Sequence, residues 1–485
     1  MRIRPITAEV SILPCRTRLP FRFGMHTMTA APLVTCRVGV ELEGGGRSVG
    51  YSSDLLVPKW FAKHPDSGVA DDWRDLLGAQ RAAMDVLLDG GSARADSAFG
   101  HWRRVYAERV EAVPREASDR LVRGEGVSLV ERALIDAACR GVGIGLHGAL
   151  TGGALGFDAG ALDETASGWT AGRLESPRRG VALRHTVGLL DAIEPGDIGD
   201  GDRVGDGLPE CLVEDIRRYG LTHFKIKITS DSDQQIDRLA RVWGAARREA
   251  GPRARVTLDG NEQFASIGQF VGVLERVERE PRFAGFLDAL LLVEQPLART
   301  RTFDREANAG MERLAAFAPC IIDEADAGLW ALPEARALGY RGISIKSCKG
   351  VFGAVLNRAR CDVWNAAADA GGAVFQSGED LTTLPVLALQ QDLELMATLG
   401  VPHVERNGHH YFRGLGHLPA AERRSACDAH GDLYESGGGG DARLRIEQGA
   451  LAFGTVIDAP GFGYAGPIDF DARTPAAAWE PDSLR

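Results

Sequence analysis

The sequence lacks the features that would place it in several large classes of protein. No apolar run approaches the roughly 20 residues that a membrane helix needs, and the N-terminus has no apolar core of signal-peptide length. Basic residues are not in excess: 56 Lys and Arg against 67 Asp and Glu give a net charge of −11. Acids and bases are interspersed, so no electrostatic footprint for nucleic acid is visible. We expect neither a membrane nor a nucleic acid as partner.

Cysteine pairs at motif spacing are also missing. The eight cysteines are scattered, and no two of them have the CxxC spacing of a zinc knuckle or a redox motif. Free thiols in a reducing cytoplasm are therefore expected. A chain of 485 residues is too long for a typical single domain and suits two or three. The simplest class is a soluble cytoplasmic enzyme.

The stretch from 223 to 228 is the most informative one. Lys225 and Lys227 alternate with Phe224, Ile226 and Ile228. In a strand, residues two apart point to the same face, so the two lysines share one side and the apolar residues share the other. Taken alone, the pattern favours an edge strand with solvated lysines. A buried ammonium would need an anionic partner.

Acidic or basic residues stand at the ends of further short apolar runs. The runs end at Asp259, Glu294, Asp323, Lys346 and Gln376, with Glu379 just beyond the last. Counted from Lys227, successive ends lie 23 to 35 residues apart, and one βα unit takes roughly 30 residues. Helix-like segments lie between the runs. A parallel β/α barrel collects its chemistry at the carboxyl ends of several strands in this way.

These motifs resemble the ordered signature of the enolase superfamily. The order runs Lys225–Ile–Lys227, Asp259–Gly–Asn261, Glu294–Gln–Pro296, Asp323–Glu324 and Lys346. The branch that it is most similar to is the mandelate racemase/muconate-lactonizing enzyme family, on its lysine-base, muconate-lactonizing-like side. The resemblance implies an α/β fold, a (β/α)8-type modified TIM barrel with an α+β capping domain. That domain is formed by the N-terminal region and the C-terminal tail.

The expected layout follows that resemblance. Residues 1–145 form the capping domain with its lid loops, 146–179 a linker, 180–415 the barrel and 416–485 the returning tail. Strands are expected at 3–13, 33–43 and 181–189, and helices at 72–88 and 209–219. The segment Ser128–Leu–Val–Glu131 has the form of a capping box and predicts the start of another helix.

Three strand-end carboxylates, Asp259, Glu294 and Asp323, can converge on one cation. Oxygen-only ligands favour Mg²⁺, and without a metal the three would repel one another. The alternative is that each is a solvated strand end paired with a lysine. Asp323 and Glu324 cannot both face inward from one strand, and the family pattern selects Asp323. The metal would stabilise the enediolate that forms when a carboxylate substrate loses its α-proton.

The resemblance makes Lys227 the base on one face of the substrate. A base must be neutral near pH 7, and we expect the neighbouring Lys225 and the metal to depress the pKa of Lys227. Lys346 comes from a strand roughly across the barrel and would serve the opposite face. Lys349 lies beyond that strand end and ranks second to Lys346.

The segment Leu19–Met28 is too apolar for an ordinary loop and too irregular for a strand. It is either a loop tucked into a core or, as the resemblance implies, a mobile lid over the substrate, with Tyr51–Trp60 as a second lid segment. Met25 and Trp60 would then help to set specificity. The residues predicted to bind substrate are Phe21, Phe23, His26, Tyr51, Asn261, Lys349, Glu379 and Glu405.

Two segments depart from better-known branches of the superfamily. Residues 375–380 hold no histidine, so a His–Asp dyad is absent, and His403–Asn407 stands where dipeptide epimerases carry paired aspartates. Glu405 and Arg406 leave open a polar acid as substrate, including a hydroxylated one. His403, His409 and His410 could suggest a second metal site, but their spacing matches no zinc motif. A turn near the barrel mouth that contacts substrate is favoured.

The function expected from these residues is abstraction of an α-proton from a small carboxylic acid by a Mg²⁺-dependent isomerase, a racemase, epimerase or cycloisomerase. A lyase of the acid-sugar dehydratase type would use the same enediolate and stays open. Remoter alternatives are a Schiff-base barrel aldolase, which needs no metal, and a non-catalytic binding protein. A homo-oligomer is expected.

Overall fold

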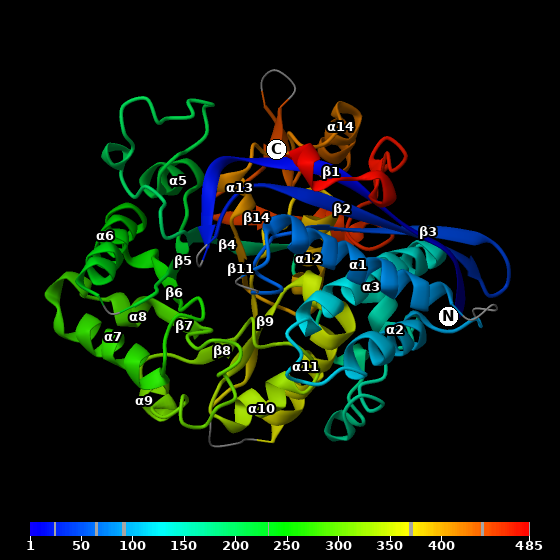
Figure 1. The fold of residues 1–485 in the computed structure, drawn as a ribbon, viewed down its shortest axis with the longest axis horizontal. Coiled ribbons are helices and arrows are strands. Elements are labelled where there is room, and N and C mark those ends of the chain that lie inside the picture. The colour runs from blue at the N-terminus through cyan, green and yellow to red at the C-terminus, as the bar shows by residue number, and fades with distance from the viewer. Residues whose placement is uncertain are drawn as a thin grey trace.

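A closed barrel of parallel strands is the centre of the molecule (Figure 1). The computed structural model describes residues 1–23, 26–63, 66–89, 94–230, 232–367, 372–437 and 441–484. Within these ranges eight strands pair in chain order, and the last pairs in parallel with the first, from His403 against Ala182 to Arg406 against His185. The strands are β4 Gly180–Val187, β5 His223–Lys227, β6 Arg255–Asp259, β7 Leu290–Glu294, β8 Cys320–Ile322, β9 Gly342–Ile345, β10 Phe375–Gly378 and β11 His403–Arg406.

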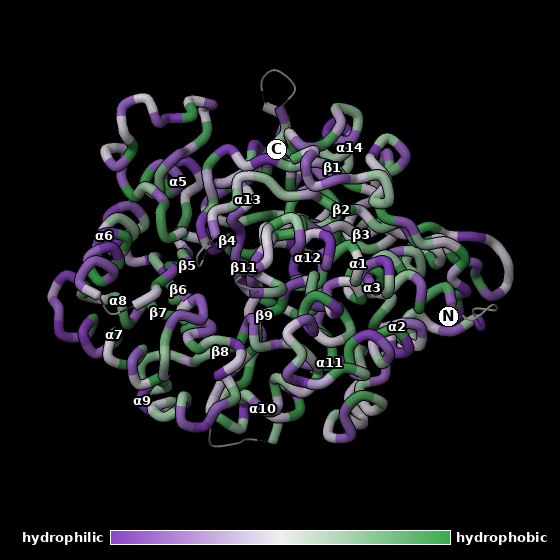
Figure 2. The backbone as a smooth tube through the Cα atoms, viewed as in Figure 1, coloured by the Kyte–Doolittle hydropathy of each residue, from purple (hydrophilic) through white to green (hydrophobic). Residues whose placement is uncertain are grey.

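Helices follow the strands and cover the outside of the barrel. On β5, Phe224 and Ile226 are buried on the side of this helical layer, and the lysines of the same strand therefore point inward. Figure 2 shows hydrophobic residues gathered along the barrel strands, with hydrophilic ones on the outer helices. The covering helices are α5 Leu212–Tyr219, α6 Asp233–Ala250, α7 Ile267–Arg279, α8 Phe286–Ala289, α9 Met311–Ala315, α10 Ala331–Ala337, α11 Val351–Ala366, α12 Leu387–Thr398 and α13 Gly408–Tyr411.

The N-terminal region forms a separate antiparallel sheet with helices against it. The sheet order is β15-β1-β2-β3, and Figure 1 shows its blue strands beside the helices α1 to α3. The strands β1 and β2 form one long hairpin that extends over the barrel mouth. The elements are β1 Ile3–Phe23, β2 His26–Leu42, β3 Arg47–Leu55, α1 Val69–Leu88, α2 Ala98–Tyr106 and α3 Arg120–Val142, with the short helix α4 Leu146–Thr151 after them.

The C-terminal tail touches both parts of the molecule. Its strand β14 pairs antiparallel with the start of β4, from Ala450 against Ala182 to Ala452 against Gly180. Its strand β15 then pairs with β1 of the capping sheet. The tail elements are α14 Ala420–Ala429, β12 Tyr434–Ser436, β13 Ala442–Leu444, β14 Ala450–Ala452, α15 Gly454–Asp458 and β15 Thr474–Pro475.

Two local expectations were wrong. Ser128 does not begin a helix, because α3 begins at Arg120 and Ser128 lies inside it, where its hydroxyl donates to the carbonyl of Ser347 at 2.7 Å. Gly126 allows α3 to pack closely against α1, because a Cβ at this position would lie 2.6 Å from the backbone of Ala79. The irregular segment 19–28 is also mostly strand, because β1 resumes its pairing with β2 from Phe21 after a register shift.

Candidate active site

A cavity of about 420 Å³ lies at the carboxyl ends of the barrel strands, under the capping domain. Both lysines of β5 and the lysine that follows β9 reach it, together with carboxylates from three other strand ends. The capping domain supplies the other wall. The residues that line the cavity are Phe21, His26, Val57, Lys59, Trp60, Lys63, Lys225, Lys227, Asp259, Asn261, Gln263, Asp323, Glu324, Lys346, Asp380, Leu381, Thr382, Glu405 and Asn407.

Lys225 lies at the bottom of this cavity among four carboxylates. Its Nζ is 3.1 Å from Asp259, 2.7 Å from Glu294, 3.0 Å from Glu379 and 2.9 Å from Glu405. Burial alone would lower the pKa of Lys225, but these four charges raise it well above its usual range. Lys225 is therefore a permanent cation that holds the carboxylates together.

Lys227 and Lys346 face each other across the barrel. The strand order places β5 and β9 four steps apart in either direction around the eight-stranded sheet. Lys227 Nζ donates to Asn261 at 3.1 Å and to Asp259 at 3.2 Å. Lys346 Nζ donates to Asp323 at 2.5 Å and lies 4.5 Å from the centre of the Trp60 ring. Two lysines thus reach one cavity from opposite walls.

Asp259, Glu294 and Asp323 stand at the ends of the consecutive strands β6, β7 and β8. All three are buried, and each contacts an inward lysine: Lys225 binds the first two and Lys346 binds the third. Lys225 and Lys227 keep the pKa of Asp259 low against the effect of burial, and Lys346 does the same for Asp323. Burial and the Glu379 charge raise the pKa of Glu294 well above its ordinary value, although Lys225 opposes them. The set offers only oxygen atoms, as a Mg²⁺ site does.

Glu324 lies beside Asp323 and also lines the cavity. Burial and the neighbouring Asp323 charge raise the pKa of Glu324 to about 7. Lys349 donates to Ser344 at 2.7 Å and pairs with Asp326 at 3.0 Å. It lines a separate, smaller cavity of about 60 Å³ between the barrel and α3.

Glu379 and Glu405 occupy different depths. Glu405 reaches the cavity wall and accepts a hydrogen bond from Thr186 at 2.6 Å. Glu379 lies below, where it pairs with Arg184 and Lys225 and accepts from Ser377 at 2.7 Å. Burial would raise the pKa of Glu379, but Arg184 and Lys225 lower it to about 2.

The hairpin β1–β2 and the loop after β3 form the roof of the cavity. Phe21 is buried and stacks on Tyr411 with ring centres 4.1 Å apart, and His26 and Trp60 also line the cavity. Burial lowers the pKa of His26, since the nearby Asp72 charge only partly opposes it. Phe23 ends β1 opposite His26, and Met25 lies outside the described residues.

Tyr51 is not brought to the cavity. It lies in the middle of β3, where its backbone N–H donates to Asp136 at 2.8 Å and its ring lies 6.4 Å from that of Phe470. The second segment of the roof therefore begins only after β3, from Val57 onward.

Salt bridges and backbone contacts hold the roof to the barrel. Arg299 donates to the carbonyls of Trp60 at 2.9 Å and Phe61 at 3.2 Å, and it pairs with Glu262 at 2.9 Å. Arg18 of β1 pairs with Asp206 at 2.7 Å and donates to the carbonyl of His410 at 2.8 Å. The described structure therefore has the roof closed onto the barrel.

Sequence reasoning missed several residues of the site. Lys59 and Lys63 line the cavity; Lys59 was present as a basic residue within the second lid segment, whereas Lys63 lies three residues beyond its end at Trp60. Arg184 was visible as an inward residue of the first barrel strand, but its partner Glu379 lies 195 residues away. In the segment 403–411, Glu405 and Asn407 reach the cavity, whereas His409 and His410 are buried elsewhere.

The described residues include no helix that is both long and apolar enough to cross a membrane. All eight cysteines are free thiols.

Known structures of the same architecture were found, although no family model and no curated protein matches the sequence. A mandelate racemase/muconate lactonizing enzyme from Roseiflexus sp. is 18% identical, with 96% of this chain and 98% of that chain covered and a TM-score of 0.56. A dipeptide epimerase from Cytophaga hutchinsonii, complexed with Mg and the dipeptide D-Ala-L-Val, is 12% identical, with 98% and 99% covered and a TM-score of 0.59.

A third structure is an enolase from Bradyrhizobium complexed with magnesium and mandelic acid. It is 14% identical, with 98% of this chain and 99% of that chain covered and a TM-score of 0.59. The likeness spans both the barrel and the capping sheet. The chain therefore has the modified TIM-barrel fold, with its capping domain, of the mandelate racemase/muconate lactonizing enzymes of the enolase superfamily.

Proposed function

We propose that the protein is a Mg²⁺-dependent isomerase that moves the α-proton of a small carboxylic acid, as a racemase, epimerase or cycloisomerase. The observation that carries the proposal is the position of Lys227 and Lys346. They enter one cavity from strands on opposite sides of the barrel, and Asp259, Glu294 and Asp323 lie at the strand ends between them.

The charges of the site support a bound dication. Five buried carboxylates, Asp259, Glu294, Asp323, Glu379 and Glu405, surround four cations, Lys225, Lys227, Lys346 and Arg184. Burial would lower the pKa of Lys346, but the Asp323 charge raises it above its ordinary value, so this lysine becomes a base when a cation shares the Asp323 charge. With Lys227 and Lys346 both neutral, as two bases must be, five carboxylates face only two cations. Mg²⁺ held by Asp259, Glu294 and Asp323 would compensate this excess and attract the substrate carboxylate.

The side chains have separate roles in this proposal. Lys227 removes the proton from one face of the substrate, while Lys346 delivers a proton to the other face or, for the opposite enantiomer, removes it. Asn261 orients Lys227 through their 3.1 Å contact. Trp60 covers Lys346 and keeps water away from it, which strengthens the charge interactions inside the cavity.

Proton NMR in deuterium oxide tests the proposal. A library of carboxylic acids, including hydroxylated acids and dipeptides, is incubated with the enzyme and Mg²⁺. We expect α-deuterium in at least one acid, loss of exchange on chelation and its return when Mg²⁺ is restored. The two enantiomers are then followed separately in Lys227→Ala and Lys346→Ala.

Each lysine variant should lose turnover but still exchange the α-proton of one enantiomer, and the two variants should differ in which one. Arg279→Ala is the control, because it removes an exposed cation of α7 that pairs with Glu275 outside the cavity and leaves both inward lysines in place. Undiminished turnover in either base variant would refute the two-base assignment. Loss of a β-substituent along with deuterium uptake would identify a lyase instead.

A further inference from the structure

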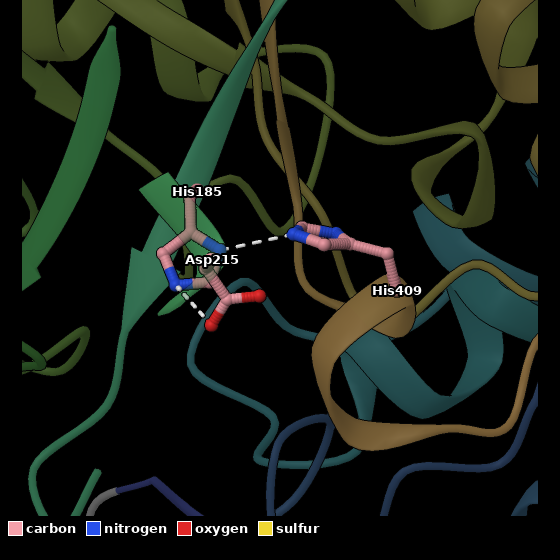
Figure 3. Close-up of side chains that lie close together, drawn as sticks. All are labelled: His185, Asp215 and His409. Atoms are coloured by element: carbon pink, nitrogen blue, oxygen red, sulfur yellow. Dashed lines mark hydrogen bonds and ion pairs between the residues drawn. The ribbon is translucent and has the colours of Figure 1, made fainter. Parts of the chain in front are cut away.

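A second cluster of ligand-type side chains lies outside the cavity, in the seam where the barrel closes (Figure 3). His185 comes from β4, Asp215 from α5 and His409 from α13. One ligand atom from each lies within 4.8 Å of the others, and no other group of three or more in the described part of the chain meets this spacing. His185, Asp215 and His409 are 1%, 0% and 8% exposed.

We propose that His185, Asp215 and His409 form a binding site for a transition-metal dication of the Zn²⁺ class. Two imidazoles and one carboxylate make a donor set that suits zinc better than magnesium, which prefers oxygen alone. The site would be structural, since it is separate from the proposed Mg²⁺ ligands.

The alternation of β4 separates the cluster from the catalytic cavity. Arg184 and Thr186 point into the barrel, where they contact Glu379 and Glu405. His185 between them must therefore point outward, toward α5 and α13. None of the three cluster residues lines the cavity of about 420 Å³.

The two imidazoles already lie close together. Nδ1 of His185 lies 3.0 Å from Nε2 of His409 (Figure 3), which requires a proton between the two rings. Two nitrogens bound to one tetrahedral zinc at ~2.05 Å would lie roughly 3.3 Å apart. Oδ2 of Asp215 lies 3.9 Å from Nε2, the other ring nitrogen of His185. Binding of one metal by all three residues therefore replaces the shared proton and requires the rings to turn and the carboxylate to move closer.

Asp215 has the free electron pairs that a third ligand needs. No described residue donates to its Oδ1 with hydrogen-bond geometry, although the side chain is fully buried. His410 Nδ1 lies 2.8 Å from Oδ2 and can orient the carboxylate from outside the ligand set. A buried carboxylate with an unused oxygen is costly in a purely structural network. A metal bound by His185, Asp215 and His409 would link β4, α5 and α13.

The test is zinc binding to the whole protein in excess Mg²⁺, which occupies oxygen-only sites. After removal of transition metals, we expect one Zn²⁺ per chain by equilibrium dialysis and elemental analysis, and a Tm that stops rising at one equivalent. Co²⁺ in its place should show the visible absorption of a four-coordinate ion. In a crystal soaked with Zn²⁺, the anomalous peak should lie between His185, Asp215 and His409.

Two variants and two controls decide the assignment. His409→Gln and Asp215→Asn should each weaken zinc binding by about 100-fold or more and abolish the Tm rise. His147→Gln, at a half-exposed histidine of α4, and Asp259→Asn, at the proposed magnesium site, should bind zinc like the wild type. Equal zinc binding in a folded His409→Gln, no binding by the wild type, or an anomalous peak only at the cavity carboxylates would overturn the proposal. The anomalous map decides even if a variant does not fold.

Discussion

Lys225 shows how one side chain can organise a site without taking part in proton transfer. Burial would lower its pKa, but four carboxylates raise it well above its ordinary value, which favours the charged form. Its replacement should leave those carboxylates buried without their common partner. We predict that Lys225→Met lowers the free energy of unfolding by about 3–5 kcal/mol, measured by urea denaturation. Lys63→Met, at a half-exposed ion pair, should cost less than about 1 kcal/mol.

Asp259 has two proposed roles: it is a ligand of the metal and it contacts the base Lys227. It contacts both Lys225 and Lys227, at 3.1 Å and 3.2 Å. Asp259→Asn keeps the shape of the side chain but removes its charge, so we predict a loss of Mg²⁺ affinity of at least about 10-fold with an unchanged circular dichroism spectrum. Calorimetric titration with Mg²⁺ measures this. Wild-type affinity in the variant would remove Asp259 from the ligand set.

Among the elements, the hairpin β1–β2 is the one that should set specificity. Phe21 stacks on Tyr411 and forms part of the cavity roof, and it is not one of the proposed metal ligands. We predict that Phe21→Ala changes the ratio of kcat/KM between a large and a small substrate by about 10-fold or more, with Mg²⁺ affinity unchanged. An equal loss of kcat/KM toward every substrate would show that the residue supports only the closed roof.

Some elements could be predicted from local sequence patterns, whereas others depend on contacts between distant residues. Strand alternation and charged strand ends were local signals, and they located β5, β6, β7 and β9 with their side chains. The start of α3 was missed because Ser128 looks like a cap, while its true partner, the Ser347 carbonyl, is 219 residues away. His185 and Asp215 were missed for the same reason: nothing near either residue in sequence indicates that the other, or His409, lies beside it.

At the scale of the whole molecule, stability should fall in mild acid. Burial lowers the pKa of His417 and of His430 to about 4, while both have a pKa near 6.5 in the unfolded chain. Between about pH 4 and 6.5 the unfolded state therefore binds more protons than the folded state. The free energy of unfolding is consequently at its full value above about pH 6.5 and decreases as the pH falls toward 4. Each histidine accounts for about 1–3 kcal/mol of the unfolding free energy that is lost on acidification.

Urea unfolding at pH 7, 5.5 and 4.5 measures this effect. His417→Gln keeps a donor for the Pro385 carbonyl, which accepts from the ring at 2.8 Å, and should reduce the loss of stability on acidification. His147→Gln provides the matched change at a half-exposed site and should leave the pH dependence as it is. An identical pH dependence in the wild type and both variants would exclude His417 as a source of the acid sensitivity.

The two pairings of the C-terminal tail have a consequence for the synthesis of the protein. β14 covers the part of the β4 edge that precedes its pairing with β5, and β15 extends the capping sheet at β1. Both strands leave the ribosome after every strand they protect. A nascent chain therefore displays two unfinished sheet edges until β14 and β15 have been synthesised, and such edges recruit other chains. Chaperone demand should consequently be greatest between completion of the barrel strands and the appearance of β14 and β15, and products truncated before these strands should aggregate even when their barrel is otherwise whole.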